Sequence, residues 1–372
     1  MKESSSLKYY QKMLKIIGSL TGLFSESDVP YLNYRVTENL FCKAFSAKNL
    51  SRSDVSVDAC IDNVGVGIKT FLNGNGKTFQ KVAEFNKQNI HFRGLKAKEI
   101  VAKVSHLRNE RIDTTKRIYG LDMMKYHCIV RKKGKILVYE TDFKLINIDE
   151  INSIKENKNT IKFFDSKNEY SFNITKSTLY KRFVTKDIFL EVDVKIIDDP
   201  FEVLEEKFLK VKDVYYSKNI KEKPFVILPL FSISADKKSV FSKSGLNQWN
   251  AEGRKRDQNE IYIPIPVWIH KRFPGFFLPR GQNFNLILPD GRMLEAKICQ
   301  DGSKALMSKH NADLGKWLLR DVLNLKEGQL LTYKKLQEIG LDSVIIERID
   351  SRTYAIDFRP SGAYEKFIDE NK

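Results

Sequence analysis

The sequence predicts an α/β (α+β) domain with a mixed sheet, followed by a mostly β domain. Its 372 residues suffice for about two domains. Helical and strand-like segments alternate up to about residue 200, whereas strand patterns dominate after about residue 260. A polar stretch at 212–224, KDVYYSKNIKEKP, ends in Pro224 and separates the two parts. We therefore expect the domains at residues 1–215 and 222–372.

The first domain interleaves helices and strands. Apolar residues at helical spacing predict helices at 5–20, 34–46, 77–88 and 96–117. Two short β-branched runs at 55–61 and 64–72 flank a turn and predict a hairpin. Further strand patterns occupy 125–143, 160–174 and 188–197. In the second domain, strands are expected within 260–269, 283–299 and 343–358.

The composition is basic and the charge is spread along the chain. The 64 Lys and Arg residues exceed the 47 Asp and Glu residues, which gives a formal charge of +17. A basic surface gains affinity for a polyanion by releasing counterions, so a nucleic-acid partner is the natural interpretation. The alternative is that the basic balance serves solubility alone.

Cysteine usage and hydropathy indicate the compartment. Cys42, Cys60, Cys128 and Cys299 show no CxxC spacing, which argues against a zinc site or a disulfide framework. The first 20 residues are amphipathic with lysines inside the apolar run, unlike a signal peptide or a membrane span. We expect a soluble, cytoplasmic protein that does not associate with membranes.

The hairpin carries an acid and a base at its open end. Asp58 stands near the start of VDACIDNVGVGIK (57–69) and Lys69 at its end. This pattern resembles the core of PD-(D/E)xK nucleases. The resemblance implies carboxylates that bind Mg²⁺ and a lysine that orients water and stabilises charge on the phosphate. The family's second acid, two residues before the lysine, is missing, because that position is Gly67.

Downstream and upstream acids are candidates to replace it. Glu84, in GKTFQKVAEFN, follows Lys69 at a spacing at which some restriction enzymes of the resembled type carry a helical metal-binding acid. Gln80 would share its helical face. Glu38 projects from an apolar helical face, where a carboxylate needs a partner. That partner is the metal site that the resemblance implies or, equally, a salt bridge to Arg35 or Arg52. The expected catalytic set is Asp58, Lys69, Glu84, Glu38 and Gln80, with Asp58 and Glu84 as metal ligands.

The second domain contains two polar segments of mixed composition, SGLNQWNAEGRKRDQNEIYIPIP (244–266) and CQDGSKALMSKHNADLGKWLL (299–319). They resemble the DNA-reading arms of the plant-B-three-like pseudobarrel domains of restriction enzymes, over about residues 224–358. Amide and guanidinium groups in the first arm suit purine edges, and short hydroxyls and cations in the second suit phosphates. The expected DNA-binding residues are Asn247, Gln248, Trp249, Asn250, Arg254, Arg256, Glu260, Ser303, Lys304, Ser308, Lys309 and His310.

Two other classes of phosphate-handling protein are disfavoured because the chain lacks their sequence motifs. NGNGKT ends like a Walker A loop, but Phe71 stands where that motif needs its first glycine. A phospholipase D-like nuclease requires a histidine two residues before a lysine, and no histidine of this chain has one.

The two resemblances together imply a type II restriction endonuclease that cleaves double-stranded DNA site-specifically with Mg²⁺. Cutting both strands calls for a homodimer at least during cleavage, and a functional pairing with a DNA methyltransferase is expected. The alternative is a non-cleaving sequence-specific DNA-binding protein with a degenerate nuclease-like domain. An RNA substrate is disfavoured, because the deep major groove of A-form RNA excludes groove-reading arms.

Overall fold

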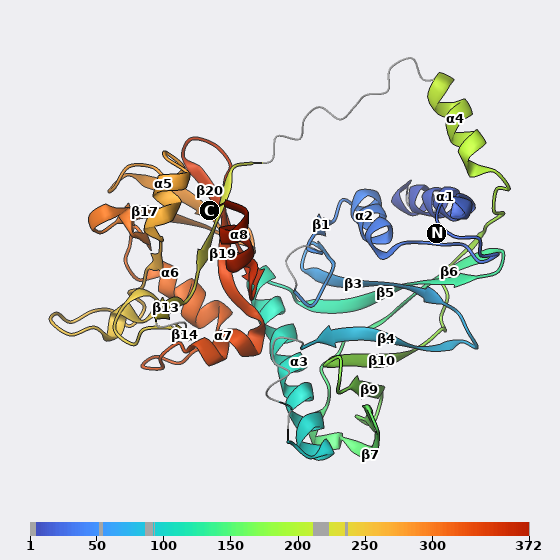
Figure 1. Cartoon of the computed structure of the whole chain (residues 1–372), viewed down its shortest axis with the longest axis horizontal. Coiled ribbons are helices and arrows are strands. Elements are labelled where there is room, and N and C mark those ends of the chain that lie inside the picture. Colours follow the sequence, from blue (N-terminus) through green and yellow to red (C-terminus); the bar gives the residue numbers. More distant parts are fainter. Residues whose placement is uncertain are drawn as a thin grey trace. The chain divides into compact units, whose positions relative to one another are not determined.

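The computed structural model describes residues 5–51, 55–85, 92, 94–210, 223–234 and 237–371 (Figure 1). The chain divides into two compact units. The first comprises residues 1–112 and 121–220, and the second comprises residues 113–120 and 221–372. The second unit therefore takes in the last turns of helix α3 (Ala97–Tyr119) as well as the C-terminal region.

A six-stranded mixed sheet forms the middle of the first unit. Strand β3 pairs antiparallel with β2 and parallel with β5, while β5 pairs antiparallel with β6. The chain makes the parallel β3–β5 connection through α3, as such pairs require a long crossover. In sheet order the strands are β1 (Lys48–Asn49), β2 (Ala59–Ile61), β3 (Val64–Leu72), β5 (Met123–Lys132), β6 (Lys135–Asp142) and β11 (Leu190–Asp193).

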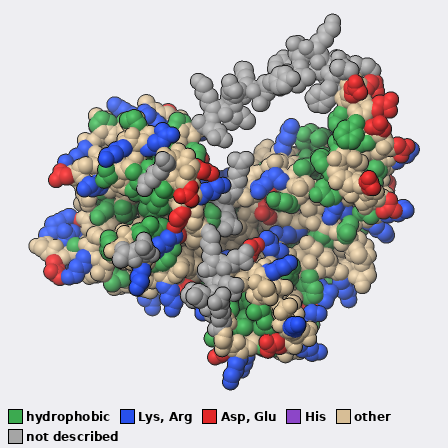
Figure 2. Space-filling model, viewed as in Figure 1, with side chains coloured by type: hydrophobic (Ala, Val, Ile, Leu, Met, Phe, Trp, Pro, Cys, Tyr) green, Lys and Arg blue, Asp and Glu red, His purple; other side chains and the backbone are tan. Residues whose placement is uncertain are grey.

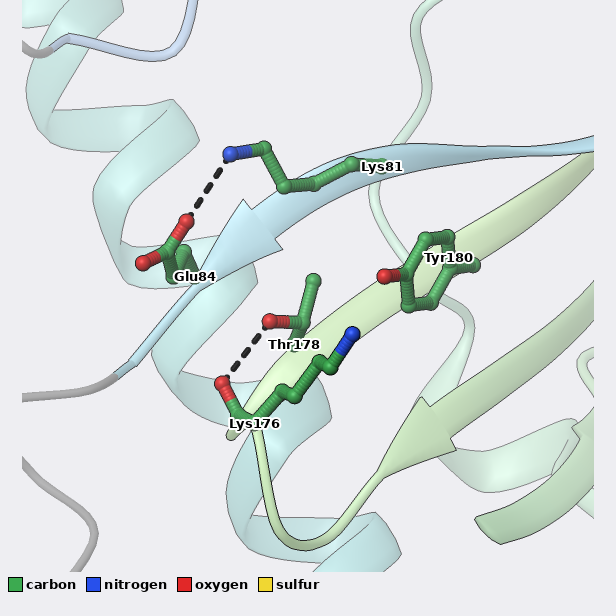
Figure 3. A pocket seen from close by; sticks show the side chains of 5 residues that line it. All are labelled: Lys81, Glu84, Lys176, Thr178 and Tyr180. Atoms are coloured by element: carbon green, nitrogen blue, oxygen red, sulfur yellow. Dashed lines mark hydrogen bonds and ion pairs between the residues drawn. The ribbon is translucent and has the colours of Figure 1, made fainter.

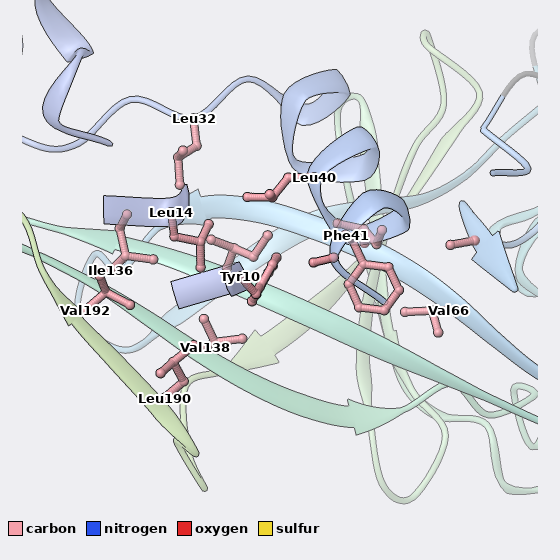
Figure 4. Packing of buried hydrophobic residues seen from close by; sticks show 14 of the residues in the cluster. Tyr10, Leu14, Leu32, Leu40, Phe41, Val66, Ile136, Val138, Leu190 and Val192 are labelled. Atoms are coloured by element: carbon pink, nitrogen blue, oxygen red, sulfur yellow. The ribbon is translucent and has the colours of Figure 1, made fainter. Parts of the chain in front are cut away.

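Helices α1 (Ser5–Ser19) and α2 (Tyr34–Phe45) cover one face of this sheet (Figure 1), which confirms the predicted helices at 5–20 and 34–46. Their apolar stripes pack on β3, β5 and β6 around Tyr10, Leu14 and Phe41 (Figure 4). The Asn33 side chain caps α2 by accepting from the Arg35 backbone N–H at 2.8 Å.

A five-stranded antiparallel sheet lies on the other face of the first sheet. The two sheets meet through Phe71 and Tyr126 of the first and Phe183 of the second, with ring centroids 6.0 and 5.0 Å apart. Helix α3, predicted at 96–117, packs its N-terminal turns on the same inner face of the second sheet. The strand order is β4 (Lys77–Glu84), β10 (Thr178–Val184), β9 (Glu169–Asn173), β8 (Thr160–Phe164) and β7 (Asn152–Asn157).

The helix predicted at 77–88 is wrong, because residues 77–84 form strand β4. The register with β10 passes from Leu179–Ala83 directly to Tyr180–Lys81, so Val82 is an extra residue in a bulge. The bulge breaks the two-residue alternation and leaves Phe79, Val82 and Ala83 at spacings typical of a helix. Residues 86–88 of the prediction lie outside the described part of the chain.

A seven-stranded barrel-like sheet dominates the second unit, as expected for a mostly β domain. Strands β16 and β20 pair in parallel, the other pairs are antiparallel, and β12 and β15, at the two ends of the order, also approach each other. The order is β12 (Phe225–Pro229), β19 (Leu341–Arg348), β20 (Thr353–Pro360), β16 (Asn283–Ile287), β17 (Met293–Cys299), β18 (Ala305–Ser308) and β15 (Ile263–Pro264), and β13 (Ser232–Ser234) pairs with β14 (Lys237–Ser239).

The strand expected within 260–269 is shorter than predicted. Within this segment only β15 is paired as a strand, and Pro266 directly precedes helix α5 (Val267–Arg272). Proline lacks the N–H that a sheet ladder uses and suits the start of a helix, which explains the early end. The remaining helices are α4 (Pro200–Lys210) in the first unit, and in the second α6 (Asp313–Gly315), a π-helix at Lys316–Val322, α7 (Tyr333–Ile339) and α8 (Ala363–Asn371). No helix among the described residues is both long enough and apolar enough to cross a membrane.

Candidate functional site

The structure brings Asp58 and Lys69 together at the open end of the β2–β3 hairpin. The Asp58 backbone N–H donates to Val66 O at 2.9 Å, and its side-chain Oδ2 accepts from the Ile68 N–H at 2.7 Å. This second bond aims the carboxylate along β3 toward Lys69, whose Nζ lies 4.0 Å from Oδ2. Both side chains are about a quarter exposed, at 24% and 26%, so solvent and a substrate can reach them.

Glu38 joins this pair from helix α2. The residue is buried at 5% exposure, and its Oε2 accepts from Arg35 at 3.0 Å. Burial raises the pKa of the Glu38 carboxyl, and the negative charge of Asp58 raises it further, whereas Arg35 and Lys69 oppose the rise. The charges of Asp58 and Lys69 therefore both act on the Glu38 carboxyl. The salt bridge to Arg35 that the sequence left open is present, and Arg52 lies outside the described residues.

Aromatic rings occupy the place of the missing acid. A Cβ at Gly67 would lie 3.0 Å from both Phe143 and Tyr126, whose rings stack with centroids 4.1 Å apart. Such contacts are tighter than nine in ten real Cβ contacts, so glycine is the residue that fits without displacing the rings. The departure from the resembled pattern is thus a requirement of the packing against Tyr126 and Phe143.

Glu84 and Gln80 occupy opposite faces of β4 rather than one helical face. Glu84 pairs with Thr178 on the outer face of the second sheet and forms an ion pair with Lys81 at 2.8 Å. Gln80 pairs with Lys181, and its amide donates to Thr78 Oγ1 at 3.0 Å. Lys181 belongs to the inner face, because it alternates with the buried Leu179 and Phe183. Because the outer face is turned away from the first sheet, the structure does not bring Glu84 to Asp58 and Lys69.

Among the described residues, no group of three or more His, Cys, Asp or Glu side chains is arranged to hold a metal ion. Among the described residues, Asp58 and Glu38 are carboxylates that interact with Lys69. Oxygen ligands of this kind suit Mg²⁺, which commonly keeps several waters and takes only one or two protein carboxylates.

Lys181 is a buried cation that sequence reasoning missed. It is 6% exposed, and its Nζ lies 5.4 Å from the ring centroids of both Tyr126 and Phe183. Burial, followed by repulsion from Arg108, lowers the pKa of Lys181 to about 8. Its position between Leu179 and Phe183 in an alternating strand was the available signal.

A second missed feature is a polar chain that runs from the buried Tyr10 and His127 to the partly exposed Glu140 and Lys125. The Tyr10 hydroxyl lies 3.0 Å from His127 Nε2, and His127 Nδ1 lies 3.2 Å from Glu140, which accepts from Lys125 at 2.8 Å. Burial lowers the pKa of His127, although Glu140 opposes this. His127 pairs with Ile68 and points into the core, and the alternation of side chains along β5 was the signal that the sequence offered.

In the first arm, Glu260 organises three polar side chains. It is 3% exposed and accepts from Gln248 Nε2 at 3.0 Å, contacts the Arg254 guanidinium, and lies 3.6 Å from Arg256 Nε. Arg256 also donates to the backbone oxygens of Ala251 and Glu252. Arg256 therefore holds the arm together, while the 58% exposed Arg254 side chain lies at its surface. Gln248 is half-buried, and its Oε1 is buried with no hydrogen-bond partner among the described residues.

Of the expected base readers Asn247, Asn250 and Trp249, Asn247 is held within the fold. Asn247 is fully buried, and it bonds to Phe241 O, Leu331 O and Leu331 N within 3.0 Å. Asn250 donates to Ser242 O at 2.9 Å. Trp249 Nε1 is buried and has no hydrogen-bond partner in the part of the chain that the structure describes.

The expected DNA-binding residues of the second arm also include both buried and exposed side chains. Ser308 is buried, donates to His310 O at 2.6 Å and accepts from Leu314 N, so it is not available to DNA. The Ser303 carbonyl bonds to His270 at 2.8 Å. Lys304, Lys309 and His310 are exposed, with Lys309 near Glu295 at 2.8 Å.

Comparison with known proteins supports the second unit as a DNA reader. Residues 222–350 match the family model of the NgoFVII C-terminal B3-like DNA-binding domain. No curated protein matches the chain. The match covers the barrel-like sheet from β12 through β19 and both arms. The chain therefore carries a C-terminal B3-like DNA-binding domain of a restriction enzyme family.

Proposed function

We propose that the protein is a type II restriction endonuclease that cleaves double-stranded DNA site-specifically with Mg²⁺. The observation that carries this proposal is the convergence of Asp58, Lys69 and Glu38 on one hairpin end, in a chain with a restriction-type DNA-binding domain. A lysine near two carboxylates suits the hydrolysis of an anionic phosphodiester, because the carboxylates can hold a metal ion and the lysine can stabilise charge on the phosphate.

The donor set fits Mg²⁺. Asp58 and Glu38 would hold the ion, and the rest of its coordination would come from water and the substrate phosphate. When bound, Mg²⁺ activates water and neutralises charge on the phosphate. The raised pKa of Glu38 reflects a buried carboxylate that gains from a nearby cation.

Each protein group then has one task. The Ile68 N–H fixes the orientation of the Asp58 carboxylate, and Arg35 fixes that of Glu38. Lys69 donates to a non-bridging phosphate oxygen and stabilises the charge that accumulates there as the scissile bond breaks. Arg254 reads base edges, while Lys304 and Lys309 contact phosphates. A second copy of the chain supplies the cut in the other strand, and a DNA methyltransferase protects the host sites.

One observation favours a second candidate, a DNA-binding protein with a degenerate nuclease-like domain. Gly67 cannot carry the usual acid, and Glu84 points to the outer face of the second sheet, which leaves two carboxylates. This alternative predicts binding without cleavage.

Plasmid digestion with and without Mg²⁺ distinguishes the two candidates. Asp58→Asn keeps an oxygen that accepts from Ile68 but removes the charge, so we expect folded protein that binds DNA and does not cut. Asp62→Asn, the same change at an exposed position of the same hairpin, is the matched control and should cut normally. Discrete Mg²⁺-dependent fragments from wild type and Asp62→Asn, absent in Asp58→Asn, support the endonuclease. A mobility shift with no fragments from wild type supports the binder.

A further inference from the structure

The second sheet of the first unit has an outer face that neither the first sheet nor α3 covers. Residues 180, 182 and 184 of β10 point to this face, since 179, 181 and 183 are buried. The residues that pair with these positions on the remaining four strands point to the same face.

One cross-strand row of this face consists of hydrogen-bond donors on all five strands. The registers pair Lys155 with Lys162, Lys162 with Ser171, Ser171 with Tyr180, and Tyr180 with Lys81. Three ammonium groups and the Tyr180 hydroxyl thus lie in line across the sheet, while Ser171, between Lys162 and Tyr180, is buried. At about 4.8 Å between strands, the row is roughly 19 Å long, which equals the rise of about six base pairs of duplex.

The acids near this row already have partners. Glu169 binds Arg182 through two nitrogens, and Glu84 binds Lys81. Lys155, Lys162, Lys77 and Lys176 have no ion pair with an acid in the described part of the chain. Lys155 and Lys162 face each other directly, a like-charge pairing that costs stability and that a bound anion would relieve.

A shallow open pocket of about 300 Å³ lies at the β4 end of the row. Lys81, Glu84, Lys176, Thr178 and Tyr180 line it. Figure 3 shows Lys176 rising from the β9–β10 turn beside Thr178, while Lys81 turns toward Glu84. The Tyr180 ring adds an aromatic surface with a hydroxyl at its tip. Figure 2 shows Lys and Arg side chains spread over the visible face of each unit.

We propose that this outer face, with Lys155, Lys162, Tyr180 and Lys81 of the row together with Lys176, is a sequence-independent binding site for the phosphodiester backbone of DNA. It is separate from the Asp58–Lys69 hairpin and from the arms of the second unit. The chemistry is the same for duplex and single-stranded DNA, because lysines and hydroxyls bind phosphate while the Tyr180 ring accepts an unstacked base. The proposal does not depend on cleavage.

The test measures the salt dependence of binding to random-sequence DNA by the full chain in EDTA. The variant Lys155→Gln/Lys162→Gln/Lys176→Gln removes three charges from the face. The matched control, Lys8→Gln/Lys12→Gln/Lys15→Gln, removes three charges from exposed positions of α1. Each lost phosphate contact lowers the slope of log K against log salt by about 0.9, so the face variant should lose about 2 to 3 in slope. The Lys→Arg triple variant should keep it.

The slope measurements distinguish a specific phosphate site on this face from a general effect of positive charge. A slope loss in the face variant alone, with thermal stability unchanged or raised, supports the site. Duplex and single-stranded probes of one sequence then show which form it prefers, and additional loss on single strands for Tyr180→Ala indicates base stacking. Equal slopes in the face variant and wild type on both probes would overturn the proposal, and so would equal losses in the face variant and the α1 control.

Discussion

Replacing Glu260 by glutamine tests whether the first arm is a base reader that a buried carboxylate positions. Glutamine keeps an oxygen for Gln248 and Arg254 but removes the charge that both arginines face. A charge-assisted hydrogen bond contributes about 1 kcal/mol more than a neutral one. Because Arg254 is more than half exposed, solvent screens part of this difference. We expect a stability loss of about 1–2 kcal/mol.

The effect on recognition should exceed the effect on stability. If Arg254 forms a bidentate contact with a guanine, losing its orientation costs about 1–3 kcal/mol of discrimination, roughly 5- to 150-fold. The assay is fluorescence anisotropy with a duplex selected from a random library and a scrambled duplex, beside chemical denaturation. The control is Glu252→Gln, which changes the exposed partner of Lys243 in the same arm and should alter neither quantity. An unchanged ratio of selected to scrambled affinity in Glu260→Gln would refute the positioning role.

Three further predictions concern the first unit. Gly67→Ala should destabilise it by about 1–3 kcal/mol, because its Cβ meets two rings at 3.0 Å. Denaturation should show partial recovery in Gly67→Ala/Phe143→Leu, and an unchanged single variant would contradict the packing account. Lys155→Gln alone should raise the free energy of unfolding by about 0.2–1 kcal/mol, and with it the thermal midpoint slightly, because the repulsion from Lys162 is removed. A lowered midpoint would argue against this. Burial lowers the pKa of His127 below its ordinary 6.5, so the unfolded chain binds more protons and stability should fall as pH drops below about 6.5. This fall should be smaller in His127→Gln, as measured by unfolding between pH 5 and 8, and equal profiles would contradict the assignment.

Much of the fold could be predicted because local patterns agree with the tertiary structure. The helices at 5–20, 34–46 and 96–117 and the hairpin around residue 62 follow from spacing and turn chemistry alone. Strand β4 could not be predicted in this way, since the bulge at Val82 imitates helical spacing and depends on a partner strand a hundred residues later. Pro264 and Pro266 likewise shorten a segment whose apolar pattern is that of a strand.

The candidate sites show the same division. Asp58 and Lys69 belong to one hairpin, so their proximity follows from the sequence. The face on which Glu84 lies depends on its pairing with Thr178, which no local pattern reveals. Asn247 and Ser308 have the composition of base readers, yet they bond to Leu331 and Leu314 respectively. Polar residues that bind DNA and polar residues that fasten a loop differ only in burial, and burial here depends on distant segments of the chain.

The most direct test of the central claim is to sequence the fragment ends of a mapped plasmid digested with Mg²⁺ by wild type and by Lys69→Gln. The account predicts that wild-type ends fall at a fixed position relative to one shared sequence. It also predicts that Lys69→Gln binds that sequence with nearly normal affinity and produces no ends. Random ends, or equal cutting by the variant, would contradict the assignment of cleavage to the Asp58–Lys69 hairpin.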